Sequence, residues 1–102
     1  MGTQVFFFNE LHPESENREY ERWVRETDYP IARALPSIGS YEVFRLEGPL
    51  ADGEVPYDYV EVVEVSDLDS YRHDLTTLSE DFKESWRGFV ARSTAVHATR
   101  ID

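Results

Sequence analysis

One carboxylate in this sequence is placed where acid–base chemistry is favoured. Glu61 lies inside a valine-rich segment, residues 57–65, with Tyr59 and Val63 expected on the same side. Apolar surroundings raise the pKa of a carboxyl group because they disfavour its charged form, which makes it usable as a general acid or base. We therefore take Glu61 as the first candidate catalytic residue. The alternative is a carboxylate that is satisfied by a buried partner or at a subunit interface.

His97 is the second candidate catalytic residue, because a histidine near its ordinary pKa can shuttle protons. It lies between Val96 and Ala98 in a segment of alternating side chains, where a single histidine is also commonly structural. His12, His73 and His97 share no i, i+2 or i, i+4 spacing, so we expect no metal site. The chain has no cysteine, which excludes thiolate ligands and thiol catalysis.

Aromatic and amide side chains in the expected strands are candidates for substrate binding. Aromatic rings stack on flat heterocycles, so Phe7, Tyr41 and Tyr59 could wall a pocket. The alternative, which apolar strand positions favour, is that they are plain core or interface residues. Asn9 lies on the same side of its strand as Phe7 and is included among the substrate-binding candidates.

Three further candidates cluster where Pro30 is expected to break the first helix. Asp28, Tyr29 and Arg33 would lie over the end of the sheet and could form a gate or anchor a polar substrate group. The alternative is a turn that is locked by an Asp–Arg pair and a packed tyrosine.

Hydrophobic periodicity predicts the elements that position these residues. Four strands are expected, at residues 5–11, 38–46, 57–65 and 91–101. The first helix is expected to begin at Pro13 and to end before Pro30, and one more helical turn is expected at residues 31–35, closed by Pro36. The second helix is expected to begin with Ser66 as its N-cap and to restart at a capping box formed by Thr77 and Glu80.

The order β-α-β-β-α-β is that of a ferredoxin-like fold of the α+β class, here a single domain over residues 1–102. Such a chain forms a four-stranded antiparallel sheet with both helices on one face. Both sides of the strands carry apolar side chains, as Phe6 and Phe7 illustrate. The open face therefore needs a partner, and we expect a two-fold homodimer, a dimeric α+β barrel with a cup between the open faces.

Charge and motif content exclude several classes of function. The net charge of −11 would repel nucleic acid and anionic membranes, and no apolar run approaches the ~20 residues of a membrane span. No glycine-rich phosphate loop or dinucleotide fingerprint is present, so we expect no bound cofactor. We expect a cytoplasmic protein, because no basic region precedes the first apolar residues.

Three segments resemble the REDY-like (HapK) family: the Tyr20-Glu21-x-Trp23 motif, the Asp-Tyr-Pro segment that begins at Asp28, and the valine-rich strand around Glu61. The resemblance covers most of the chain. It implies a ferredoxin-like fold, a homodimer, and a role in tailoring an aromatic, nitrogen-containing natural product of the prodiginine or bisindole type. A condensation or ring closure is the implied reaction.

Three functions compete at this point. The first is a cofactor-independent tailoring enzyme that binds a small aromatic heterocycle and uses Glu61 and His97. The second is a non-catalytic binding or chaperone protein for a reactive pathway intermediate. The third, which rests on analogy of fold alone, is a haem-degrading or oxygenase-like protein.

Overall fold

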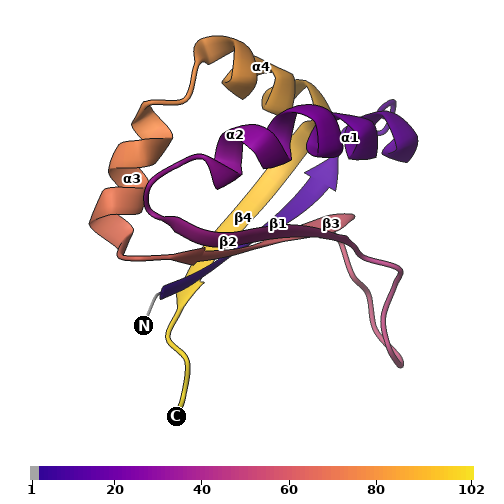
Figure 1. Ribbon diagram of the computed structural model, residues 1–102. Coiled ribbons are helices and arrows are strands. Elements are labelled where there is room, and N and C mark those ends of the chain that lie inside the picture. Colours follow the sequence, from indigo (N-terminus) through magenta and orange to yellow (C-terminus); the bar gives the residue numbers. More distant parts are fainter. Residues whose placement is uncertain (1–2) are drawn as a thin grey trace.

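The computed structural model describes residues 3–102 and has the expected order of elements. One antiparallel sheet contains four strands in the spatial order β2-β3-β1-β4: β1 (Thr3–Leu11), β2 (Ile38–Arg45), β3 (Tyr59–Val65) and β4 (Val90–Ala98). The helical segments are α1 (Asn17–Trp23), η1 (Val24–Asp28), α2 (Tyr29–Arg33), α3 (Leu68–Thr76) and α4 (Glu80–Phe89). All of them cover the same face of the sheet (Figure 1). The predicted ferredoxin-like α+β fold is confirmed.

The helix starts differ from those predicted. Pro13 does not begin a helix, because α1 starts only at Asn17. Asp67, not Ser66, caps α3, and its side chain accepts a hydrogen bond from the Ser70 amide at 2.8 Å. The second helix does restart, but Ser79 is the N-cap of α4. Both observed caps directly precede the first helical residue, where a side-chain oxygen reaches the free amides of the first turn.

Pro30 does not end the first helix. A proline inside a helix lacks the amide hydrogen and clashes with the carbonyl four residues earlier. The chain accommodates Pro30 by widening the preceding turn into a π-helical segment, Val24–Asp28, in which the Tyr29 amide bonds to the Val24 carbonyl. The helix then continues as α2. Such π-helical turns often occur at functional sites, and this one ends at Asp28.

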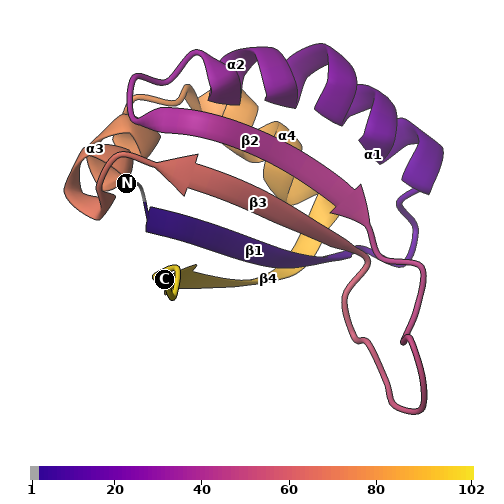
Figure 2. The same cartoon turned by 60° about the horizontal axis from the view of Figure 1, so that its bottom comes forward.

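The two faces of the sheet have different surroundings. Val5, Val63 and Val65 are buried under the helices, as is Glu61, whereas the opposite face is open (Figure 2). The cup that Glu61 faces therefore lies within one chain, between sheet and helices. The expected location between two open sheet faces is wrong, because alternation along a strand defines two sides without telling which one the helices cover. The homodimer itself stays a prediction.

The open face keeps an apolar character. Phe6 pairs with Val62 and Phe8 with Val60 along neighbouring strands, and these side chains are half-buried. Phe44 on the neighbouring strand β2 is 52% exposed.

Within residues 3–102, the helices are too short or too polar for any of them to span a lipid bilayer.

Candidate functional site

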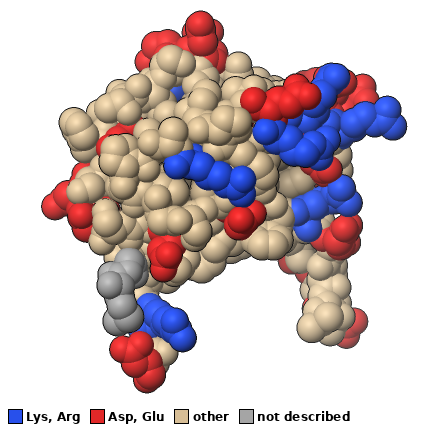
Figure 3. All heavy atoms as spheres, viewed as in Figure 1, with Lys and Arg blue, Asp and Glu red and all other residues tan. Residues whose placement is uncertain are grey.

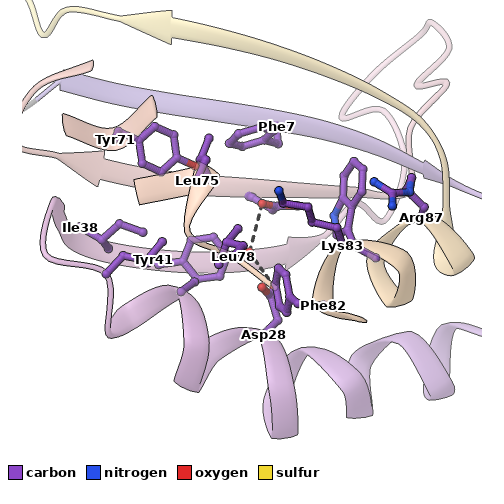
Figure 4. A pocket seen from close by; sticks show the side chains of 14 residues that line it. Phe7, Asp28, Ile38, Tyr41, Tyr71, Leu75, Leu78, Phe82, Lys83 and Arg87 are labelled. Carbon is purple, nitrogen blue, oxygen red and sulfur yellow. Dashed lines mark hydrogen bonds between the residues drawn. The ribbon is translucent and has the colours of Figure 1, made fainter. Parts of the chain in front are cut away.

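A cavity of about 260 Å³ opens between the sheet and the helices. Glu61 on β3 lines it, together with Tyr41 on β2, Asp28 at the end of the π-helical segment and Phe7 on β1 (Figure 4). These four were all predicted as site residues. Lys83 and Arg87 on α4 also line it, and the rest of the wall is largely apolar: Ala32, Leu35, Ile38, Tyr71, Leu75, Leu78, Phe82 and Trp86.

Glu61 lies at the buried end of this cavity, with 6% of its surface exposed. Its Oε2 accepts a hydrogen bond from Asn9 Nδ2 at 2.6 Å, and its Oε1 lies 3.0 Å from the Tyr41 hydroxyl. Burial raises the pKa of Glu61 to about 7, and the nearby Asp28 charge adds to the rise, while hydrogen bonds from Asn9 and Tyr41 and the Trp86 indole oppose it. Glu61 is thus a carboxyl group that changes protonation near neutral pH.

Asp28 is the second buried carboxyl group of the site. Its Oδ2 lies 2.6 Å from the Tyr41 hydroxyl, and only 3% of its surface is exposed. Burial raises the pKa of Asp28 to about 6, against the opposing effects of the Tyr41 hydrogen bond and the Arg33 charge. The π-helical turn caused by Pro30 brings this aspartate into the helix face that covers the sheet.

The two carboxyl groups share one hydroxyl. Tyr41 lies within hydrogen-bond distance of both Asp28 and Glu61, yet a tyrosine hydroxyl has a single proton to donate. Both contacts are hydrogen bonds only if one carboxyl group is protonated and donates to the tyrosine oxygen. Arg33 favours the charged form of Asp28, and the pKa of Glu61 is the higher of the two, so Glu61 is the carboxyl group that takes up a proton more readily.

Tyr29 and Arg33 support this arrangement from outside the cavity. The Arg33 guanidinium donates two hydrogen bonds to the Tyr41 carbonyl oxygen, at 3.2 and 2.9 Å, and pairs with Glu42 at 3.1 Å. It also stacks over the Tyr29 ring at 3.8 Å, and the Tyr29 hydroxyl accepts from the Val43 amide at 3.0 Å. These contacts fasten the helix to β2, as the locked-turn alternative requires, although Arg33 bonds to the β2 strand rather than to an aspartate.

Tyr59 faces the helices like Glu61 but belongs to a separate cluster. Its ring packs on Tyr20 with centroids 4.7 Å apart, and its hydroxyl donates to Glu21 at 2.6 Å. The hydrogen bonds from Arg45 and Tyr59 lower the pKa of Glu21 to about 2. Tyr59 is not among the residues that line the Glu61 cavity.

His97 lies apart from the cavity in the single chain. It is exposed on β4, an edge strand, where it pairs with Val5. His73 is exposed on α3, and His12 approaches the Arg87 carbonyl oxygen through Nε2 at 3.0 Å. Among residues 3–102, no three histidine or acidic side chains converge as a metal-binding group.

The sequence candidates include four of the fourteen lining residues, and the ones that were missed include four on α4. Phe82 and Trp86 recur at helical spacing and read as core, yet both line the cavity beside Glu61. Lys83 and Arg87 also line it and add positive charge. The one sequence feature that sets any of these residues apart is that Lys83 is the only lysine in the chain.

Comparison with solved structures shows the same fold at low sequence identity. The crystal structure of HapK from Hahella chejuensis is 22% identical, with a TM-score of 0.73 over 98% of this chain and 95% of that one. A dimeric ferredoxin-like protein of unknown function from Thermobifida fusca is 18% identical, with a TM-score of 0.71 over 98% and 92%. Hydroxynitrile lyase from Passiflora edulis is 7% identical, with a TM-score of 0.76 over 94% and 90%.

No curated protein matches the chain significantly. The family model described as REDY-like protein HapK matches residues 3–101, nearly the whole sequence. The chain therefore belongs to the HapK family of REDY-like proteins.

Proposed function

We propose that this protein is a cytoplasmic, cofactor-independent enzyme that performs acid–base catalysis on a small aromatic heterocycle. The single observation that carries the proposal is the Tyr41 hydroxyl, which lies within hydrogen-bond distance of both buried carboxyl groups, Glu61 and Asp28, in a largely apolar cavity. Enzymes place raised-pKa carboxyl groups in such clefts because a proton can then be given or taken near neutral pH.

The reaction that this arrangement supports is a condensation or ring closure. In its charged form, Glu61 takes a proton from an acidic carbon or nitrogen of the ligand, and the resulting nucleophile attacks an electrophilic carbon. Glu61 then returns that proton to a hydroxyl group on the attacked carbon, and this hydroxyl leaves as water, so the carboxyl group ends as it began. Tyr41 and Asp28 buffer that proton, and Asn9 fixes the orientation of Glu61.

Family membership supports a role in tailoring an aromatic alkaloid of the prodiginine or bisindole type. A lyase from Passiflora edulis has the same fold, so the fold is compatible with an enzyme. We also propose a homodimer formed through the open sheet face, because Phe6, Phe8 and Phe44 leave an apolar surface there and a related structure is described as dimeric.

Deuterium exchange tests the catalytic proposal without knowledge of the natural substrate. Indole-3-pyruvate has an acidic carbon beside a carbonyl, and its exchange with D2O can be followed by proton NMR. We expect the protein to accelerate this exchange at least about tenfold over buffer, and Glu61→Gln to remove the acceleration. Glu64→Gln is the matched control, since Glu64 lies on the same strand but alternates to the other side. Equal acceleration by wild type and Glu61→Gln refutes the proposal.

A non-catalytic binding protein is the second candidate. Hydrogen bonds occupy both Glu61 oxygens and favour this alternative. A buried carboxyl group whose oxygens are both hydrogen-bonded can be purely structural, so its burial does not require a catalytic role. Calorimetric titration of indole-3-pyruvate into the wild type and into Glu61→Gln separates the enzyme from the binding protein. An enzyme retains binding in Glu61→Gln and loses exchange, whereas a carrier shows binding without exchange in either protein.

A further inference from the structure

We propose that the ligand of this cavity carries an anionic group, a carboxylate or its equivalent, that pairs with Lys83 and Arg87 while the aromatic body reaches inward to Glu61. This inference names the ligand class of the proposed function and rests on it.

The exposure of the lining residues fixes which end of the cavity is open. Asp28 and Glu61 are nearly inaccessible, whereas the side chains of Lys83 and Arg87 are 32% and 56% exposed. Both basic side chains project from α4 on one side of the pocket, and Lys83 extends inward (Figure 4). A ligand that enters past α4 therefore meets two positive charges before it meets the carboxyl groups.

The charges of the cavity favour a monoanion. Lys83 and Arg87 contribute two positive charges, and Asp28 and Glu61 contribute one negative charge when one of the two is protonated, which their raised pKa values favour. One anionic group on the ligand would neutralise the lining. This basic pair stands out in a chain of net charge −11, and Figure 3 shows a largely uncharged surface between α2, α3 and α4.

Within residues 3–102, no residue holds either cation firmly. Lys83 and Arg87 both approach a single carboxylate, that of Glu80, at 3.8 Å, and the Glu80 side chain is 76% exposed. Such exposed and long ion pairs contribute little stability, so a ligand carboxylate that is partly enclosed by the cavity competes well for both.

The apolar wall fits a flat ring system. Phe7, Phe82 and Trp86 present aromatic surface to the cavity, and aromatic faces stack on planar ligands. The volume of about 260 Å³ lies just below the ~300–1,000 Å³ typical of ligand pockets, which suits one or two fused rings.

Two ligands of nearly equal shape test the inference. Calorimetry on the full chain compares indole-3-acetate, an anion, with indole-3-acetamide, its neutral analogue. We expect the anion to bind about tenfold more tightly. Lys83→Met keeps the apolar stem but removes the charge, and should bring the two affinities within about threefold. Arg92→Gln, which loses an exposed charge that pairs with Glu10 on β1, is the control and should leave the preference intact.

A second measurement places the anion and does not depend on the variant folding. Because Lys83 is the only lysine, reductive methylation with 13C-formaldehyde gives it one side-chain resonance and keeps its charge. Indole-3-acetate should shift this resonance, and the acetamide should leave it nearly unchanged.

Three outcomes overturn the inference: the two ligands bind with equal affinity, the lysine resonance does not move, or neither ligand binds. Failure of the proposed catalysis is separate, because it appears as Glu61-independent deuterium exchange with the anion preference intact.

Discussion

Replacing Glu61 by glutamine should make this protein more stable at alkaline pH. The amide has the shape and hydrogen-bonding pattern of a protonated glutamate: its oxygen can accept from Asn9, and its NH2 group can donate to the Tyr41 oxygen. Tyr41 then remains free to donate to Asp28. The substitution fixes the protonated arrangement and removes the need to bury a second negative charge.

The magnitude follows from the pKa of Glu61, which folding raises from 4.5 to about 7. A raised carboxyl pKa means that the folded state favours the proton, so the stabilisation is complete below pH 4.5 and is lost as the pH rises to about 7. At ~1.4 kcal/mol per pKa unit, the free energy of unfolding of the wild type should fall by about 2 to 3 kcal/mol from about pH 5 to about pH 8. Asp28 shares this proton, so its own raised pKa is not counted separately.

Urea denaturation at a series of pH values, at one protein concentration, measures this effect. Glu61→Gln should show a shallower decline and exceed the wild type by about 2 to 3 kcal/mol at about pH 8, which corresponds to a rise in Tm of roughly 10–20 °C for a domain of this size. Tyr20, Tyr41 and Tyr71 also lie near Glu61, and their raised pKa values keep them neutral throughout this range.

Glu64→Gln removes the same formal charge from the other side of β3 and serves as the control. If Glu61→Gln loses stability at about pH 8, or if both variants have the same pH dependence as the wild type, then Glu61 does not hold a proton in the folded state and the reasoning is refuted.

Three further perturbations have defined outcomes. Tyr41→Phe leaves both buried carboxyl groups without their shared hydroxyl, and should cost about 2 to 3 kcal/mol in urea denaturation and abolish deuterium exchange; unchanged stability would argue against the hydrogen-bonded chain. Arg45→Gln removes the bidentate pair with Glu21 and should raise the pKa of Glu21 from about 2 toward 4.5. Acid denaturation should then shift to higher pH, with little change in stability at neutral pH because Arg45 is half exposed. An unchanged acid denaturation curve would contradict this. Phe44→Glu on the open sheet face should convert a dimer to a monomer in sedimentation velocity, with circular dichroism unchanged; identical sedimentation of both proteins would place the dimer contact elsewhere.

The framework of the site is predictable from local patterns. Alternating and valine-rich segments identify strands, and an internal carboxylate such as Glu61 stands out against them. Phe7, Tyr41 and Asp28 also join the cavity as expected. These predictions depend only on the period of the strands and on the order of the elements, which are properties of the sequence itself.

The parts that escaped prediction depend on how elements pack. Pro30 indicates a break in the helix, but only the packed helix reveals a π-helical turn that brings Asp28 toward Tyr41. Trp86 and Lys83 share one helical face with core residues, and their place in the cavity depends on the rotation of α4 over the sheet. The exposure of His97 depends on β4 being an edge strand.

Titration of the carboxyl carbons by 13C NMR tests the shared proton most directly. In protein labelled at the side-chain carboxyl groups of glutamate and aspartate, Glu61→Gln and Asp28→Asn identify the two resonances. We expect the Glu61 carbon to titrate with a midpoint near 7, and the Asp28 carbon to respond over the same pH range. A Glu61 midpoint near the ordinary 4.5, with no coupled response at Asp28, would contradict the account.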